Sequence, residues 1–431
     1  MVQRAALLAL STLLSCLLVP PFAAASGSGS FALTGSTSAP LAEAAAAPLG
    51  DGRVLAAGGV YGGYFSGAEV FNPTSGTWGA VSPMSTPRAD PVAARLPDGR
   101  VLVAGGDYYS GGQVYLKSAE AYNPVANIWT SLSDMGTPRE AAVAAPLGDG
   151  RVLVAGGFYD DGSPHLLKSA EIYNPASNLW APVASMSTPR EFAVAAPLPG
   201  GRVLVAGGIG TGGVPLGSAE VYDPAGNAWT GVGGMSTVRS LAVAAPLGDG
   251  RVLVAGGSDP STSLNGFSSA EVFNPSTNSF SSTGIGAMTT ARLAAVAAPL
   301  SDGRALVAGG VARQGGPVLS SAEIFAATNT FSFSVKGRQL TLGVQAGGSV
   351  SVSDAAAPLK AAKKKRRLLL KPSSATGDPP TITVTLRLSK LAKQRLRQAG
   401  KVTVRARITF TPQGGVANTR TAKLRIRSKK K

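Results

Sequence analysis

Six copies of one repeat fill residues 30–330, and this repetition constrains the fold more than any other feature of the chain. Every copy contains a Gly-Gly pair after an apolar run such as RVLVAGG, and successive pairs lie 47 to 53 residues apart. An Ala-Glu dipeptide, an aromatic residue and, six or seven residues later, a second large aromatic residue follow each pair. A unit of this size cannot bury a core alone, so the copies must pack against one another.

The order of these residues resembles the kelch motif, and the resemblance covers about 70% of the chain. The first aromatic position holds Phe71, Tyr122, Tyr173, Tyr222, Phe273 and Phe325, and the second holds Trp78, Trp129, Trp180, Trp229, Phe280 and Phe331. The resemblance implies an all-β fold, a six-bladed kelch-type β-propeller with one four-stranded blade per repeat.

Two local signals define the strands inside each repeat. An Asp-Gly step, such as Asp149-Gly150, separates two apolar runs and predicts a two-residue hairpin turn, because Asn-Gly and Asp-Gly tolerate positive φ at both turn positions. The Gly-Gly pairs mark places where the backbone turns and no Cβ would fit.

The phase of the repeats bears on how the ring closes. Phe31 stands 17 residues before Pro48, just as Trp229 stands 17 residues before Pro246. We therefore predict that residues 30–35 join the last blade as its outer strand and that Phe331 opens the next domain. The alternative leaves Phe331 in the last blade and Phe31 free.

A second domain is predicted at residues 331–431. Apolar residues alternate with Thr, Lys or Arg around 382–388, 402–410 and 424–426, which is typical of half-buried strands. Residues 389–399 read as a short helix ending at Gly400. We expect a small basic β-sandwich, similar to immunoglobulin-like modules, with a Lys/Arg-rich loop at 355–380.

Charge is divided unevenly between the two parts. The net charge of +17 combines about −5 for residues 1–333 with +22 for residues 334–431, where 24 Lys and Arg face 2 Asp and Glu. The residues predicted to contact an anionic surface are Lys363, Lys364, Lys365, Arg366, Arg367, Arg405, Arg407, Arg425 and Arg427. A solvated, solubilising face is the alternative explanation.

The N-terminus has the pattern of an export signal. Arg4 precedes an apolar run, and Ala23-Ala24-Ala25 offers small residues for cleavage, so residues 1–25 are predicted to be a secretory signal peptide. Cys16 lies in a loose lipobox, which leaves lipid anchoring as a minor alternative. An extracellular or cell-surface location argues against nucleic acid as a partner, and no transmembrane segment is expected beyond the signal.

Five arginines recur just before the innermost strands, namely Arg88, Arg139, Arg190, Arg239 and Arg292. In kelch propellers this position lies near one mouth of the central channel, where converging arginines would bind an anion. Each repeat also carries one Glu, so Arg–Glu pairs that lock the blades together are the competing interpretation.

Variable loops follow the Gly-Gly pairs and should cluster on one face. Their aromatic residues are candidate contacts for a carbohydrate or a protein: Tyr61, Tyr64, Phe65, Tyr108, Tyr109, Phe158 and Tyr159. Packing of the loops against the blades is the alternative.

Catalysis is poorly supported by the composition. The architecture resembles galactose oxidase, but its copper site needs two His and a Tyr–Cys crosslink, whereas this chain has one His and one Cys. His165 beside Asp160 and Asp161 is a weak metal signal. No catalytic residue, metal site or cofactor is predicted.

The sequence therefore predicts an exported, monomeric, non-catalytic binding protein. Its propeller loops would recognise a protein or carbohydrate, and its basic domain would associate with an anionic cell-surface polymer. A galactose oxidase-like or glycan-hydrolysing enzyme and a structural or adhesion surface protein remain the alternatives.

Overall fold

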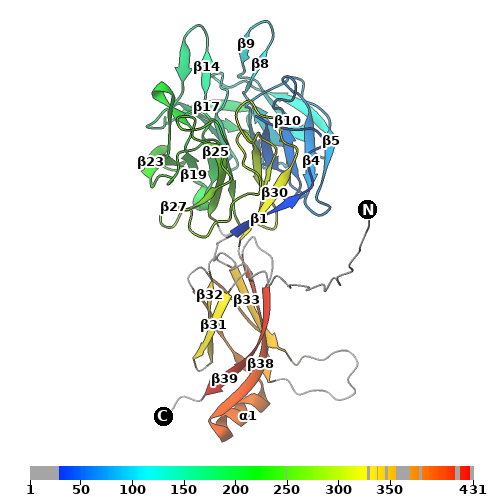
Figure 1. Cartoon of the computed structure of the whole chain (residues 1–431), viewed down its shortest axis with the longest axis vertical. Helices are drawn as coiled ribbons and strands as arrows, with labels where there is room; N and C mark the ends of the chain where they lie inside the picture. The colour runs from blue at the N-terminus through cyan, green and yellow to red at the C-terminus, as the bar shows by residue number, and fades with distance from the viewer. Residues whose placement is uncertain are drawn as a thin grey trace, which may run out of the picture.

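A computed structural model gives the structure of residues 29–248, 250–327, 331–336, 338–344, 348–355, 369–377, 381–412 and 418–427. The predicted signal peptide, Cys16 and the KKKRR run at 363–367 lie outside these described residues. The structure contains six four-stranded antiparallel sheets followed by a smaller group of strands (Figure 1). The all-β fold with a six-bladed propeller is confirmed.

The first three blades each take four strands in succession, from the innermost to the outermost. Blade 1 contains β2 (Ala45–Pro48), β3 (Val54–Ala57), β4 (Ala68–Asn72) and β5 (Thr77–Val81). Blade 2 contains β6 (Val92–Arg95), β7 (Val101–Ala104), β10 (Ala119–Asn123) and β11 (Ile128–Leu132). Blade 3 contains β12 (Val143–Pro146), β13 (Val152–Ala155), β16 (Ala170–Asn174) and β17 (Leu179–Val183).

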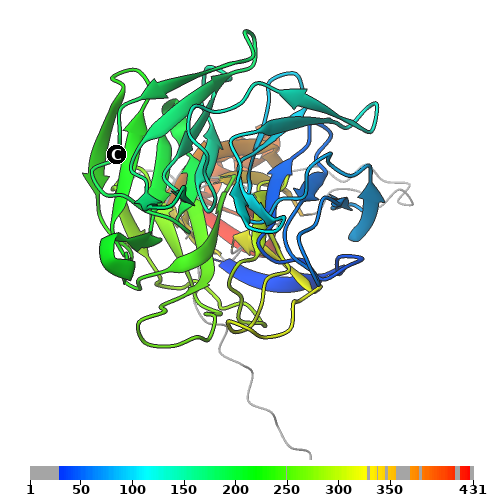
Figure 2. The same ribbon diagram turned by 90° about the horizontal axis from the view of Figure 1, so that it is seen from above.

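The last blade is completed by the N-terminal strand. Blade 4 contains β18 (Val194–Pro197), β19 (Val203–Ala206), β22 (Ala219–Asp223) and β23 (Ala228–Val232), and blade 5 contains β24 (Ser240–Pro246), β25 (Val252–Ser258), β26 (Ala270–Asn274) and β27 (Ser279–Ser281). Blade 6 contains β28 (Val296–Pro299), β29 (Ala305–Ala308), β30 (Ala322–Ala327) and β1 (Gly29–Thr34). Phe31 lies opposite Phe325, so the predicted closure is confirmed (Figure 2).

The Asp-Gly turns differ from the prediction. In blade 1, Leu49 and Arg53 form the last backbone pair, and the amide of Gly52 donates to the carbonyl of Leu49. Only Gly52, at φ 88°, has positive φ, while the side chain of Asp51 accepts from the amide of Arg53. The loop therefore has three residues, a type I turn followed by a glycine in the left-handed region. A second residue with positive φ is not needed, because the side chain of Asp51 stabilises the turn by a hydrogen bond to the backbone.

The core of the propeller lies between blades. Six hydrophobic clusters each combine the inner strands of one blade with the middle strands of the next, including one that joins blade 6 to blade 1. The paired aromatics of the repeat stack within each blade, as in Tyr122 and Trp129 with ring centroids 5.1 Å apart. The indole of Trp129 also donates to the carbonyl of Ser82, which ties the preceding connection to the blade.

The described residues between 331 and 427 share one hydrophobic cluster, and we call them the C-terminal domain. Its sheets are β31 (Phe331–Lys336), β32 (Gln339–Val344) and β36 (Thr381–Thr385); β35 (Ser373–Gly377), β33 (Gly348–Asp354), β38 (Lys401–Pro412) and β39 (Asn418–Arg427); and β34 (Leu370–Lys371) with β37 (Arg387–Leu388). The helix α1 (Lys390–Ala399) is capped by Ser389 and ends at Gly400 with φ 64°, as predicted. Both larger sheets contribute to the shared cluster, and the immunoglobulin-like resemblance stays a prediction.

The two faces of the propeller are distinct. The Asp-Gly turns lie at the face from which β30 leads into the C-terminal domain. The loops after the Gly-Gly pairs lie at the other face, which we call the loop face. It carries the short hairpins β8 (Asp107–Tyr109) with β9 (Gln113–Tyr115), and β14 (Phe158–Asp160) with β15 (Pro164–Leu166), which rise away from the C-terminal domain in Figure 1.

Candidate functional site at the loop face

The five recurring arginines do not line the channel mouth. Their side chains are 0–1% exposed, so the prediction that they bind an anion there is wrong. Arg88 shows the common arrangement: its Nη1 donates to the carbonyls of Gly105 and Ser118, and its Nη2 donates to Ser118 Oγ and Glu120 Oε1. A guanidinium with these acceptors and no solvent has no room for a ligand.

The competing interpretation, that Arg–Glu pairs hold the blades together, fits these contacts. Each Glu also accepts two backbone amides from the connection that enters its own blade; Glu120, for example, accepts those of Ser85 and Thr86. Leu41 replaces the arginine before blade 1, and there Glu69 accepts the amides of Ser38 and Ala39. The repeated ion pair therefore fastens each connection to its blade.

A closed ring of backbone hydrogen bonds surrounds the central axis at the loop face. Each of six residues, one per blade, donates its amide to the carbonyl of the equivalent residue in the preceding blade, at 2.8 to 3.1 Å. All six have φ between 46° and 55°, in the left-handed region. They are Glu43, Asp90, Ala141, Phe192, Leu241 and Ala294.

Acidic side chains gather on the part of this ring that belongs to blades 1 to 4. Glu43 and Asp90 belong to the ring, Glu140 and Glu191 directly precede ring residues, and Asp107 forms a bridge with Ala89 beside Asp90. The remaining part, in blades 5 and 6, carries Leu241, Ala294 and their neighbours. The ring and the alanines below it line a cavity of about 120 Å³. We call the five carboxyl residues the acidic rim.

The acidic rim is electrostatically strained. Burial raises the pKa of Glu140 to about 8, with the charge of Asp107 and a hydrogen bond to it adding to the effect. Burial is also the main cause that raises the pKa of Asp90, and the surrounding carboxylates, Glu43 first, raise it further. Burial likewise raises the pKa of Glu43 and of Glu191. The charges with the largest effect on Asp90 are all negative, so a cation placed beside Asp90 would lower its pKa again.

Sequence reasoning missed the acidic rim. A signal was present for three of the five residues: Asp90, Glu140 and Glu191 fall one or two positions after a repeated arginine, where the repeats differ from one another. A position that varies beside an invariant structural residue is free to serve binding.

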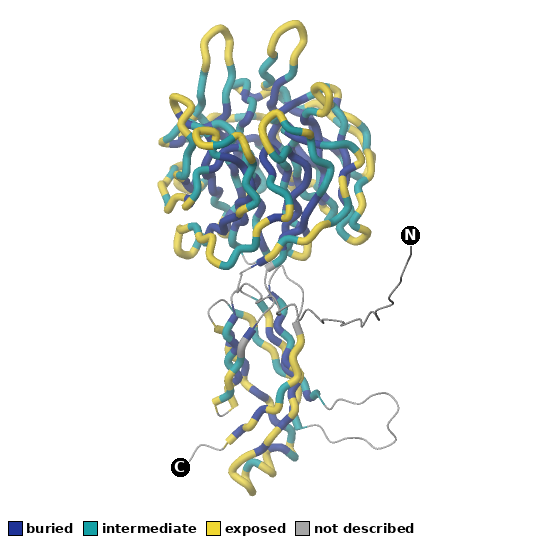
Figure 3. The backbone as a smooth tube through the Cα atoms, viewed as in Figure 1, coloured by how far each residue is buried: buried dark blue, intermediate teal, exposed yellow. Residues whose placement is uncertain are grey.

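The variable loops stand directly on this rim. Glu140 is bridged to Phe158, the first residue of β14, and Glu191 is bridged to Ile209 at the start of β20 (Ile209–Gly210), which pairs with β21 (Val214–Pro215). Gln113 of β9 contacts Asp107, and it hydrogen-bonds to the Tyr64 hydroxyl at 3.2 Å. Figure 3 shows that the tips of the tall hairpins are exposed.

The predicted loop aromatics divide into two groups. Tyr61, Tyr64, Phe65 and Tyr109 are exposed, at 55%, 37%, 38% and 63%. Tyr108, Phe158 and Tyr159 are partly buried. The rings of Phe158 and Tyr115 meet edge-on at 5.9 Å, and Tyr159 stacks on His165 at 4.4 Å. The first group is the more exposed one and offers the larger contact surface.

His165 has local partners. Its Nε2 lies 3.0 Å from Asp161 Oδ1 on the same hairpin. Within the described part of the chain, no group of three or more His, Cys, Asp or Glu side chains is arranged to hold a metal ion.

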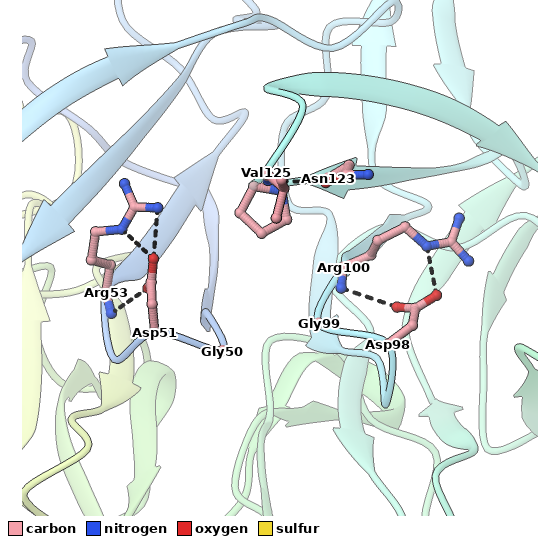
Figure 4. Close-up of a pocket in the computed structure, with 9 residues that line it drawn as sticks. Gly50, Asp51, Arg53, Asp98, Gly99, Arg100, Asn123 and Val125 are labelled. Atoms are coloured by element: carbon pink, nitrogen blue, oxygen red, sulfur yellow. Dashed lines mark hydrogen bonds and ion pairs between the residues drawn. The ribbon is translucent and has the colours of Figure 1, made fainter.

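A wider hollow of about 520 Å³ lies at the opposite face, between blades 1 and 2. Figure 4 shows that each of its arginines, Arg53 and Arg100, is held by the aspartate of its own turn, at 2.7 and 2.8 Å. The hollow exists because blade 1 has Gly50 where blade 2 has Pro97. Pro97 packs against Gly150, the turn glycine of blade 3, whereas a Cβ at Gly99 in blade 2 would have no neighbour within 4 Å. The arginines and aspartates of these two turns are therefore paired with each other and leave no unpaired charge in the hollow.

The predicted cations of the C-terminal domain lie together on one sheet face. Arg405 and Arg407 of β38 and Arg425 and Arg427 of β39 are all exposed, while the residues between them are buried. The structure thus brings these four together, and the lysines and arginines at 363–367 lie outside the described residues.

The kelch motif model matches residues 44–85, 91–136, 141–187, 193–236 and 241–283, just over half of the chain. The chain belongs to the kelch-repeat family. The five matched segments correspond to blades 1–5, and the sixth repeat is split between the two ends of the propeller by β1. Membership of this family supports a protein-binding propeller.

Two relatives share part of the propeller. Kelch-like ECH-associated protein 1B of Danio rerio is 35% identical over 77 residues, which are 17% of this chain and 13% of that protein. Kelch-like protein 35 of Mus musculus is 34% identical over 109 residues, 25% of this chain and 18% of that protein. The kelch protein thus spans less than a fifth of either relative.

Two solved structures share the fold. YjhT superposes with a TM-score of 0.56 at 16% identity, over 67% of this chain and 96% of its own. A fungal alcohol oxidase of the AA5 family, solved in complex with copper, superposes with a TM-score of 0.52 at 15% identity, over 92% of this chain and 100% of its own. Among the described residues of the kelch protein, no helix is long and apolar enough to cross a membrane.

Proposed function

We propose that this kelch protein is a non-catalytic binding protein that holds a protein ligand on its loop face. The observation that carries the proposal is the position of the exposed aromatics on loops that surround the acidic rim. Exposed tyrosines are common anchors of protein interfaces, because they bury a large area with little loss of side-chain freedom. A Lys or Arg of the ligand beside the rim would lower the raised pKa values of these carboxyl groups and pair with them once they are ionised, which favours a ligand segment with Lys or Arg beside apolar residues.

The C-terminal domain has a separate part in the proposal. Its exposed Arg405, Arg407, Arg425 and Arg427 share one sheet face, which supports association with an anionic polymer. The predicted signal at residues 1–25 would place both activities outside the cytoplasm, at the cell surface or in the surrounding medium. The loop face would then present its ligand at the end of the molecule opposite the basic domain.

An array of synthetic peptides and glycans, probed with the full chain, tests the binding function. We expect binding to peptides that combine Lys or Arg with an aromatic or aliphatic residue, and weak binding to their Lys→Glu versions. Binding to neutral glycans alone would indicate that the loop face recognises carbohydrate. Binding to no peptide would reject the proposal of a protein ligand.

A copper-loading assay tests the enzymatic alternative. We expect no stoichiometric copper uptake and no turnover of alcohols or sugars. One copper per chain together with oxidase activity would replace the binding function by a catalytic one.

A further inference from the structure

One sheet face of the C-terminal domain is built from only four residue types. In the described sheet of β35, β33, β38 and β39, every side chain on the outer face is Ser, Thr, Lys or Arg. The opposite side of the same strands supplies Val, Leu, Ile and Phe to the core. Asp354, the acidic residue of these strands, is 5% exposed and turned inward, where it accepts the amides of Leu369 and Leu370.

The cations occupy two adjacent strands in register. Lys401 lies directly opposite Arg427, and Arg405 lies directly opposite Lys423. Arg425 lies between these two pairs, and Arg407 lies two residues beyond Arg405. The face therefore carries six cations: Lys401, Arg405, Arg407, Lys423, Arg425 and Arg427. We call them the cation ladder. No ion pair within the described residues joins them to a carboxylate.

This arrangement is unfavourable for the isolated domain. Directly opposed side chains on antiparallel strands have Cβ atoms about 5 Å apart, and like charges at that position destabilise a sheet. Cations two residues apart on one strand, such as Arg405 and Arg407, are about 7 Å apart. Both distances are shorter than the screening length of about 8 Å at physiological salt, so the repulsion persists. A bound polyanion would remove it.

The remaining side chains on this face narrow the class of polyanion. No aromatic side chain lies on the described outer face, so it offers no platform for stacking the bases of a single-stranded nucleic acid. It has no exposed large apolar side chain to enter a lipid layer. Hydroxyl groups instead continue the cation rows, as in the run Ser353, Arg407 and Thr421 across three strands. Cations beside hydroxyls match a polymer that carries both charges and sugar hydroxyls.

We propose that the cation ladder binds a linear acidic polysaccharide laid along β38 and β39. The inference rests on the proposed association of this domain with an anionic polymer and names the class of that polymer. The ladder supplies the charge contacts, and the flanking serines and threonines hydrogen-bond to sugar hydroxyls.

The test uses the full chain and five immobilised probes: dextran sulfate, polygalacturonate, neutral dextran, a 30-base-pair DNA duplex and vesicles containing phosphatidylglycerol. The ladder variant is Arg405→Ser/Lys423→Ser. The matched control, Lys393→Ser/Arg397→Ser, removes one Lys and one Arg from exposed positions of α1.

We expect dextran sulfate or polygalacturonate to be bound best, and the choice between them tells a sulfated from a carboxylated source. The ladder variant should lose at least about 10-fold in affinity at 50 mM salt, and the slope of log K against log [salt] should fall by about 2, one for each contact removed. The control should lose less than about 2-fold. The ladder variant should also melt at or above the temperature of the parent, since it removes a like-charge pair.

Three results would overturn the proposal. An equal loss in the control would show that binding follows net charge alone. Preference for DNA or vesicles, lost in the ladder variant, would leave association with an anionic polymer intact and refute the polysaccharide class. Binding to none of the anionic probes would reject the association itself, without bearing on the peptide-binding loop face.

Discussion

Replacing Glu140 by Gln tests whether the acidic rim strains the fold. The pKa of Glu140 is raised from its ordinary value of 4.5 to about 8, mainly by burial and next by Asp107. Each pH unit of that difference is worth about 1.4 kcal/mol, and water around the partly exposed side chain reduces the total to roughly 2–4 kcal/mol.

The sign follows from proton binding. The folded protein holds a proton on Glu140 between pH 4.5 and 8, whereas the unfolded chain has released it. The stabilisation by this proton is fully present below about pH 4.5 and is lost as the pH rises through 8. The amide introduced by Glu140→Gln keeps a hydrogen-bond donor toward Asp107 and has no charge to gain.

Urea unfolding at pH 5, 7 and 9 measures the effect. The Glu140→Gln variant should match the parent to within about 0.5 kcal/mol at pH 5 and exceed it by roughly 2 kcal/mol or more at pH 9. Asp160→Asn, a change at an exposed site on the neighbouring hairpin, should leave the pH dependence unaltered. A Glu140→Gln difference that is the same at every pH would refute the strain assigned to the rim.

Three further predictions concern the propeller itself. Glu171→Ala should lower the free energy of unfolding in urea by about 3–5 kcal/mol, because Arg139 is then buried without its carboxylate. Glu69→Ala leaves no arginine unpaired and should lower it by about 1–2 kcal/mol. Equal losses in the two variants would contradict the role of the ion pair. Phe31→Ala should lower the free energy of unfolding by about 2–4 kcal/mol, because it removes packing against Phe325 in the last blade. Leu33 lies on the same strand and is 66% exposed, so Leu33→Ser should be nearly neutral. Thermal melts that rank the two variants otherwise would argue against closure by β1. Gly106→Ala should cost roughly 3 kcal/mol or prevent folding, because its φ is +84° and a Cβ would lie 2.4 Å from the carbonyl of Ala89; a soluble variant with parental stability would be inconsistent with this geometry.

The fold was largely predictable because the repeat encodes it redundantly. Five copies share the Asp-Gly turn, and every copy has the glycine pair and an aromatic pair, so a departure in one copy, such as Pro199-Gly200-Gly201, does not obscure the pattern. The spacing of Phe31 from Pro48 also predicted the closing strand, because it gives the N-terminal segment the position of an outer strand, and the last blade can take that strand. The three-residue turns were missed since Asp51 replaces a second positive φ by a side-chain hydrogen bond, which spacing alone does not reveal.

The candidate site was less predictable, for a physical reason. Arg88 and its equivalents recur and are charged, which makes them conspicuous in the sequence, yet their regularity reflects a structural role in every blade. The acidic rim residues occupy different offsets in different repeats, and only closure of the ring brings them together. Chain spacing within a repeat carries no information about distances across the axis.

Titration of one array-selected basic peptide against the full chain tests the central claim most directly. If the exposed aromatics of the loop face anchor the ligand, Tyr61→Ser/Tyr109→Ser should raise its Kd at least about 10-fold, while Val125→Ser/Leu179→Ser, which alters exposed apolar residues outside the loop face, should leave it within about 2-fold. An unchanged Kd in the tyrosine variant, or an equal loss in both variants, would contradict ligand binding at the loop face.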